Sequence, residues 1–392
     1  MNQKYASTVA YYLAFILLGL MIAAEGPTLL KLAEHTSSAL DQISLLFLFG
    51  SLGYLLGSYI GGRLYDRVPG HPFMAGVLIF VGITIALIPL ASSRGVLFAV
   101  ALTSGLFKGA LDVGCNTLLL WVHNEKVGPF MNGLHAFFGV GAFIAPLIVA
   151  QVLSATGDIY WVYWLFAILS FPLAIWIWNL PSPASRAVPA HHVSTPLPIF
   201  PVLIMVLCFV LYVGGEAGYG AWIYTYAFTL NFGTEVTAAY LTSAFWGAFT
   251  LGRLFGIWFS TRARPITILI LDFAGCILSI GLILLFPQSR FVLWLGTILF
   301  GISQASVFPT FLTLGEEPMH VTGTIAGLFL VGAGIGGMIL PWLIGQAFVQ
   351  VGAGAMMAMI FVGIVLNWLM LILFTKVSLR SSPVTESAAI AD

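Results

Sequence analysis

The sequence predicts an all-α integral membrane protein with twelve transmembrane helices in two pseudo-symmetric six-helix bundles. The first observation is composition: of 392 residues, 60% are hydrophobic and only 7% are charged, whereas soluble proteins carry about 25% charged residues. Second, apolar runs long enough to cross a bilayer recur along the whole chain. Third, short motifs of the first half return in the second half at a constant offset.

The composition and motifs also exclude several classes of function. The net charge is zero, so nothing favours binding to nucleic acid or to an acidic partner. The three cysteines lie in apolar runs without a CxxC or Cys/His pattern, and we expect neither a metal site nor a cofactor. The chain has no Gly-x-Ser-x-Gly, P-loop or His-Glu-x-x-His motif, which predicts that it is not an enzyme. It also lacks the repeated filter loop that is typical of channels.

Twelve apolar runs reach the length of about 20 residues that a spanning helix needs. We predict spans at roughly 8–30, 43–62, 72–92, 95–121, 128–153, 159–180, 199–230, 237–260, 265–287, 291–315, 321–348 and 353–375. One long polar segment, rich in Pro, Ser and His, separates the sixth span from the seventh. The predicted domains are an N-terminal bundle at 1–180, a cytoplasmic linker at 181–198, a C-terminal bundle at 199–375 and a cytoplasmic tail at 376–392.

The distribution of basic residues predicts the orientation of these spans. If the N-terminus is cytoplasmic, the inner side carries nine basic residues: Lys4, Arg63, Arg67, Lys126, Arg186, Arg262, Arg264, Lys376 and Arg380. The outer side then carries three, Lys31, Arg94 and Arg290. Because basic residues concentrate on the cytoplasmic side, both termini are expected there. We expect a monomer in the plasma (inner) membrane.

Two pairs of segments indicate a parallel internal repeat. Motifs in the second and fifth spans match motifs in the eighth and eleventh spans at one offset of 195 residues. The matched pairs are Gly57/Gly252, Gly61/Gly256, Arg67/Arg262, Gly139/Gly334, Gly141/Gly336 and Pro146/Pro341. Such a repeat is typical of transporters built from two related halves. The small residues in the motifs allow close helix approach.

The fourth span carries the charges around which we expect the chain to be organised. Lys108, Asp112 and Asn116 are spaced four apart and share one helix face. A charged residue in a span costs on the order of 2.5–3.5 kcal/mol on insertion scales, which favours a functional role. We interpret this face as a proton- or cation-linked site that also binds substrate hydroxyls. The alternative is a Lys108–Asp112 pair that only holds the bundle together.

The seventh span contains a second candidate carboxylate. Glu216 lies in the glycine-rich stretch YVGGEAGYG, which indicates a loosened, gating helix, and we expect its carboxylate to accept hydroxyl groups or to titrate. Tyr219 and Trp222 follow on the same helix. Aromatic faces stack on sugar rings, although roles in packing are equally common for such residues.

Further candidates come from other spans. Glu25 in the first span either pairs with Lys108 or begins the external loop. Arg253 in the eighth span is expected to act in gating rather than in substrate contact. The remaining candidates for substrate contact are Asn132, His135, Trp246 and Gln304.

The segment after the second span carries a recognisable motif, which reads GRLYDRVPGH from Gly62. With twelve spans in two parallel halves, this motif resembles that of the major facilitator superfamily. The resemblance implies a cytoplasmic latch, in which Asp66 caps the neighbouring half, and gating roles for Gly62, Asp66, Arg67 and Arg262. The motif departs from the family pattern because a residue is inserted before Gly70 and the second basic residue is His71.

Longer stretches are similar to the fucose/sodium-dependent-glucose transporter branch of that superfamily. They are GPTLLKLA, LGYLLGSYIGGRLYDR, LDVGCN, GPFMNGLHAFFGVGAFIAP, YVGGEAGYG and FWGAFTLGRLFG. The resemblance implies symport of a neutral sugar such as a hexose by alternating access, with H⁺ or Na⁺ as the coupling ion. It also implies a substrate or proton-network role for His135. Protons are preferred because Lys108 supplies a positive charge when Asp112 is ionised.

Two other functions stay open from the sequence. The first is proton-coupled export of a drug-like or amphipathic lipid-like molecule, which a mostly apolar cavity wall favours. The second is a substrate-free scaffold, which the buried charges disfavour.

Overall fold

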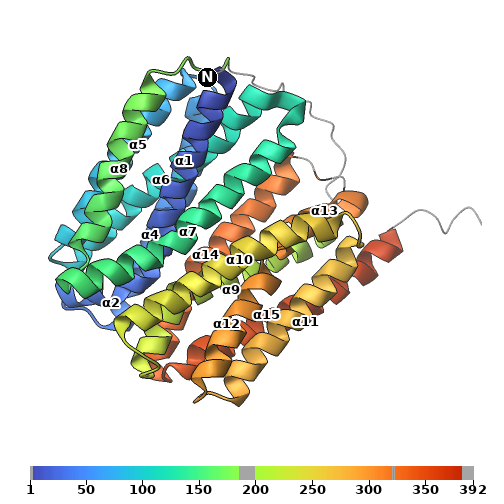
Figure 1. Cartoon of the computed structure of the whole chain (residues 1–392). Coiled ribbons are helices and arrows are strands. Elements are labelled where there is room, and N and C mark those ends of the chain that lie inside the picture. The colour runs from blue at the N-terminus through green and yellow to red at the C-terminus, as the bar shows by residue number, and fades with distance from the viewer. Residues whose placement is uncertain (1–2, 185–198, 320, 322, 382–392) are drawn as a thin grey trace, which may run out of the picture.

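The computed structural model describes residues 3–184, 199–319, 321 and 323–381 (Figure 1). Within these residues the chain is helical, and no strand is formed. The first bundle contains α1 (Gln3–Ala23), α2 (Glu25–His35), α3 (Leu40–Ile43), α4 (Leu45–Tyr65), α5 (Gly70–Leu87), η1 (Ile88–Leu90), α6 (Arg94–His123), η2 (Asn124–Lys126), α7 (Gly128–Thr156) and α8 (Tyr160–Trp178). The second contains α9 (Ile199–Thr229), α10 (Glu235–Ser260), α11 (Pro265–Leu285), α12 (Arg290–Gln304), α13 (Val307–Met319), α14 (Gly323–Gln350) and α15 (Gly354–Ser381).

Eleven helical segments of the described chain are long and apolar enough to cross a membrane. The predicted eighth span is not among them, although α10 is 26 residues long and packs against α7, α9 and α12. Its hydropathy is lower because Arg253 and several serine and threonine residues interrupt the apolar sequence. With α10, the helices fill all twelve predicted positions of the two-bundle fold.

Two of the predicted spans are interrupted in a similar way. The first breaks at Ala24, between α1 and α2, and the tenth breaks between α12 and α13. A proline follows each break, Pro27 in α2 and Pro309 in α13. Proline has no amide hydrogen, so the carbonyl four residues earlier loses its usual helical partner. The breaks therefore free backbone carbonyl groups within two spans.

The repeat found in the sequence is also visible in the packing. A Cβ atom at Gly57 would collide with the carbonyl of Leu106, so only glycine lets α4 approach α6 this closely. At the matched position, a Cβ at Gly252 would lie 2.8 Å from the carbonyl oxygen of Ile302. The contact of α7 with α1 is repeated by α14 with α9 in the same way: Gly141 lies on Ile16, and Gly336 lies on Val210. Corresponding helices therefore pack alike in the two bundles.

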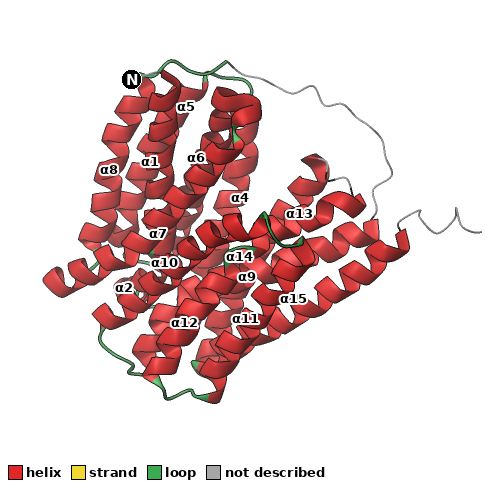
Figure 2. Ribbon diagram, turned by 45° about the vertical axis from the view of Figure 1, so that its right-hand side comes forward, coloured by secondary structure: helices red, strands yellow, loops and turns green. Residues whose placement is uncertain are grey.

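The two bundles meet mainly at one end. We call this the distal end, which contains the α2–α3, α7–α8 and α9–α10 connections; the opposite, linker end contains the N-terminus and the end of α8. Near the distal end, Gln346 donates to the carbonyl of Asp41 at 2.7 Å, and Gln151 donates to Tyr240 at 3.0 Å. Ser243 also donates to a carbonyl of α7 at 2.5 Å. Toward the linker end, the ribbons of the two bundles diverge (Figure 2).

Candidate functional site

The lysine of the fourth span is paired with the glutamate of the first. The Lys108 ammonium on α6 donates to a carboxylate oxygen of Glu25, the first residue of α2. The side chain of Lys108 is 6% exposed and that of Glu25 is 25% exposed. Of the two possibilities for Glu25, the pair with Lys108 is therefore the one that forms.

The alternative interpretation, a Lys108–Asp112 pair that holds the bundle together, is wrong, because Lys108 pairs with Glu25. Spacing by four residues does align the two Cβ atoms on α6. However, helical side chains lean toward the N-terminus of their helix, and this direction carries the Lys108 ammonium away from Asp112. The spacing of four residues correctly predicted that Asp112 and Asn116 share a face of α6, but it did not predict that Lys108 pairs with Glu25.

Asp112 is held instead by two neutral hydrogen-bond donors. Tyr54 of α4 donates to one carboxylate oxygen at 2.6 Å, and the amide of Asn116 donates to the other at 3.0 Å. Among the ion pairs that the described residues form, none includes Asp112. Its side chain is half-buried. In the described chain, the Asp112 carboxylate therefore has hydrogen-bond donors but no basic side chain as an ion-pair partner.

A second polar cluster lies in the C-terminal bundle, on α9, α10 and the end of α12. The Tyr212 hydroxyl donates to the carbonyl of Gln304 at 3.1 Å. Glu216, one turn along α9, interacts electrostatically with Arg253 of α10 and lies close to the Tyr212 hydroxyl. The cluster thus combines a carboxylate and a guanidinium without a direct ion pair between them, among the pairs of the described chain.

Apart from Oγ1 of Thr225 on α9, three buried polar atoms on these helices have no hydrogen-bond partner in the described structure. They are Nε1 of Trp246, Nε of Arg253 and Oε1 of Gln304. Gln304 and Trp246 both face α9, because a Cβ at Gly215 would lie 3.6 Å from the Gln304 amide nitrogen and one at Gly220 would lie 3.5 Å from Trp246 Nε1. Buried polar groups normally have partners, so these atoms are suited to contact a polar ligand.

Tyr219 and Trp222 are fully buried, and their polar atoms have protein partners. The Tyr219 hydroxyl bonds with the Thr297 hydroxyl at 2.7 Å, and Trp222 donates to the Pro341 carbonyl at 2.8 Å. The Trp222 ring also packs against Phe348 of its own bundle at a centroid distance of 5.3 Å and against Phe47 of the N-terminal bundle at 6.2 Å. This geometry favours packing over ligand contact for both residues in this conformation.

Asn132 and His135 are exposed near the beginning of α7, in its half toward the linker end. The His135 ring packs edge-on against Phe15 of α1 at a centroid distance of 5.6 Å, and it interacts electrostatically with Arg253 of α10. His135 thus contacts Phe15 of its own bundle and lies within electrostatic range of Arg253 of the other bundle.

No hydrogen bond or ion pair of the described chain joins an expected latch residue to the opposite bundle. Gly62 is half-buried against α6, while Asp66 and Arg67 are exposed, and neither takes part in an ion pair of the described chain. Arg262 donates to the carbonyl of Trp258 at 3.0 Å. The divergence of the bundles at the linker end is consistent with an open latch in this conformation.

His71, where the motif departs from the family pattern, is fully buried. Its Nε2 bonds with the Tyr11 hydroxyl at 2.6 Å, and its Nδ1 bonds with the Leu180 carbonyl at 3.1 Å. Its backbone amide donates to Ser182 at 2.7 Å. The histidine thus attaches α5 to α1 and to the chain that follows α8, instead of serving as an exposed cation.

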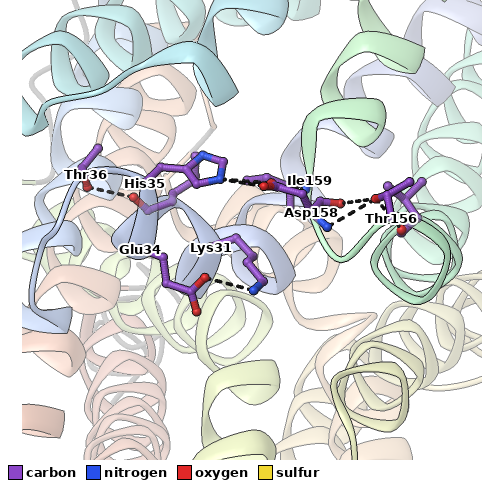
Figure 3. A network of polar contacts seen from close by, with 9 residues as sticks. Lys31, Glu34, His35, Thr36, Thr156, Asp158 and Ile159 are labelled. Atoms are coloured by element: carbon purple, nitrogen blue, oxygen red, sulfur yellow. Dashed lines mark hydrogen bonds and ion pairs between the residues drawn. The ribbon is translucent and has the colours of Figure 1, made fainter.

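At the distal end, a polar network attaches α2 to the turn between α7 and α8 (Figure 3). His35 lies 3.0 Å from a carboxylate oxygen of Asp158. Gly157 in this turn has a φ of 73°, a left-handed conformation that favours glycine. Lys31 donates to Glu34 at 2.9 Å, and this hydrogen bond raises the pKa of the Lys31 ammonium. The network fixes the segment that follows Glu25.

Sequence reasoning missed several polar residues of these clusters. Tyr54 and Tyr212 bond with residues far away in the chain, and no local pattern indicates such partners. Ser104 and Tyr163 line a small cavity beside Lys108 and Glu25. Ser104 lies one turn before Lys108 on the same face of α6, which was the one available signal.

Comparison with known proteins identifies the family to which this chain belongs. The profile of the Major Facilitator Superfamily matches residues 11–341. Sodium-dependent glucose transporter 1 of Xenopus laevis is 30% identical over 354 residues, which cover 83% of this chain and 72% of the relative.

Solved structures show the same fold. The D-xylose-proton symporter superposes with a TM-score of 0.74 at 12% identity, covering 93% of this chain and 97% of that one. The nucleoside transporter NupG has a TM-score of 0.73 at 16% identity, covering 96% and 99%. The chain is therefore an integral multi-pass membrane protein and a transporter, not an enzyme, and it belongs to the major facilitator superfamily.

Proposed function

We propose that the protein is a secondary active transporter that takes up a neutral sugar such as a hexose together with a cation. The names of similar proteins support the substrate class, since one is a sodium-dependent glucose transporter and another a D-xylose-proton symporter. The small molecule and the lipid bilayer are the partners that this function requires, and we propose a monomer as the working unit.

One observation carries the choice of a hydroxylated substrate. Trp246 and Arg253 each have a buried N–H group without a partner in the described chain, and Gln304 has an unpartnered carbonyl oxygen. A sugar hydroxyl both donates and accepts, so it suits this mixture of donors and an acceptor. Glu216 beside them is suited to accept a further hydroxyl. A drug-like substrate would leave these polar atoms unsatisfied, which costs binding free energy.

The arrangement of the bundles supports alternating access. With both termini in the cytoplasm, as the basic residues predict, the distal end is the outer one. The hydrogen bonds of Gln346 and Gln151 then close the outer side, while Asn132 and His135 face the inner side. We therefore assign this conformation as inward-facing.

Asp112 is our choice for the coupling carboxylate. Its neutralisation needs a cation from solution, because Lys108 is engaged by Glu25. We place protons ahead of sodium, because a proton needs only one carboxylate oxygen, whereas a metal cation needs several oxygen ligands and Asn116 directs an N–H group at Asp112.

The test is transport by the purified protein in liposomes. Counterflow with a panel of hexoses, pentoses, polyols and nucleosides identifies the substrate without any ion gradient. Accumulation is then measured under an imposed pH gradient and under an imposed sodium gradient. Accumulation of a hexose under the pH gradient supports the proposal in full, whereas sodium-driven accumulation corrects the ion. Absence of sugar counterflow, with export of apolar drugs against a pH gradient, contradicts the proposal.

A further inference from the structure

A small cavity lies beside the Glu25–Lys108 pair, inside the N-terminal bundle. It is enclosed by α2, α4, α6, η1 and α8 and has a volume of about 20 Å³ for a water-sized sphere. Four polar residues line it, Glu25, Ser104, Lys108 and Tyr163, and the rest of its wall is apolar. A space of this size holds one water molecule or one small ion.

The Ser104 hydroxyl is unpartnered although it is buried. The residue is 1% exposed, and its Oγ has no hydrogen-bond partner in the described structure. Tyr163, on the other wall, bonds with the Thr28 hydroxyl at 2.7 Å and keeps a lone pair on its oxygen. Buried polar atoms without partners are rare in proteins. The cavity is therefore lined by two hydroxyl oxygens and a carboxylate.

The backbone at this place is also broken. Glu25 follows the interruption between α1 and α2 at Ala24, and Pro27 has no amide hydrogen for the Ala23 carbonyl. The carboxylate and the two hydroxyl groups that line the cavity are oxygen ligands of the kind that hard cations prefer.

We propose that this cavity is a latent sodium site in which the Lys108 ammonium takes the place of the metal ion. With Lys108 in place, the pair is neutral, and a second cation would add an uncompensated charge to a buried site. Without the ammonium, the Glu25 carboxylate is left unpaired and needs another cation. The coupling ion of Asp112 is a separate matter, so the inference does not rest on the proposed transport function.

The test uses thermal unfolding of the purified full chain in detergent, in sodium chloride and in choline chloride of equal ionic strength. We expect Lys108→Ala to unfold at a lower temperature than the wild type in choline, and to gain roughly 3 °C or more in saturating sodium. The sodium response of the wild type is expected to be smaller. Lys31→Ala, which removes a lysine at the distal end, is the matched control and should respond as the wild type does.

The Glu25→Gln/Lys108→Ala double variant identifies the ligand. Loss of the extra sodium response in this variant supports a site at Glu25. A sodium response of Lys108→Ala no larger than that of the wild type contradicts the proposal. Lys108→Gln serves as a second variant, since its amide retains a hydrogen bond to Glu25. If neither single variant folds even in sodium, sodium does not replace the ammonium, and the proposal is wrong. None of these outcomes depends on sugar transport, because each is measured by thermal unfolding alone.

Discussion

Lys108 of α6 pairs with Glu25 of α2, 83 residues earlier in the chain, and leaves Asp112, one turn further along its own helix, to two neutral donors. The charged groups of Glu25, Lys108 and Asp112 therefore divide into a neutral pair and a lone carboxylate. Because a coupling group has to change its charge during transport, we propose the coupling role for Asp112 and a structural role for the Glu25–Lys108 pair.

Asp112→Asn is expected to abolish accumulation against a gradient and to leave counterflow intact. The asparagine carbonyl still accepts from Tyr54, but the side chain no longer binds and releases a cation, and counterflow needs no net cation movement. Uptake driven by a pH gradient and counterflow are measured in the same proteoliposomes. Glu34→Gln, which neutralises an exposed carboxylate at the distal end, is the control. Full accumulation by Asp112→Asn would remove Asp112 from coupling.

Lys108→Ala is expected to destabilise the fold in sodium-free buffer by about 3–5 kcal/mol, because it leaves a buried carboxylate unpaired. Replacing both partners, as Glu25→Leu with Lys108→Met, is expected to recover most of this loss. Denaturant or thermal unfolding of the two variants measures the difference. If Glu25→Leu/Lys108→Met is as unstable as Lys108→Ala, the Glu25–Lys108 pair stabilises the fold by more than mutual charge neutralisation.

The orientation of the chain is tested by labelling. Single cysteines at position 4 and in the tail after Lys376 are expected to react with membrane-permeant reagents only, since nine basic residues favour the cytoplasmic side for these ends. Ready reaction of either cysteine with an impermeant reagent from outside would reverse the assignment of inner and outer sides.

The fold was predictable from sequence, because length and apolar content decide that a segment spans the membrane. The offset of 195 residues likewise predicted matched packing, which Gly57 on Leu106 and Gly252 on Ile302 now show. The breaks at Ala24 and after Gln304 were not predicted, although the prolines that follow them, Pro27 and Pro309, were available local signals. Partner choice was less predictable still: the donors to Asp112 include Tyr54, and the partner of Lys108 is on another helix. Such contacts depend on which helices become neighbours.

Glu216→Gln is expected to weaken sugar binding by about 1.5–3 kcal/mol, the range for hydrogen bonds to charged groups. The substitution keeps the shape of the side chain and removes its charge beside Arg253. The half-saturating sugar concentration in counterflow measures the effect, and Glu235→Gln at the beginning of α10 is the control carboxylate. An unchanged affinity in folded protein would exclude Glu216 from the sugar site.

The contact of α2 with α9 is expected to decide whether the distal end closes. A Cβ at Gly26 would lie 2.7 Å from the carbonyl oxygens of both Gly220 and Ala221, so a larger residue there collides with backbone. Gly26→Leu should therefore hold the bundles apart at this end and reduce uptake several-fold. Gly76→Leu on α5 is the control, since a Cβ at Gly76 meets nothing within 4 Å.

The readout for this closure is a cysteine at Ser44, which is fully buried at the distal end next to Gln346. The three native cysteines are buried and free and are replaced in the background. In Gly26→Leu, an impermeant reagent should label Ser44→Cys from outside much faster than in the parent or in Gly76→Leu, because the leucine favours the conformation open at the distal end. Equal labelling rates in the two leucine variants would show that the α2–α9 contact does not control closure, since both carry the same added side chain and differ only in what it meets.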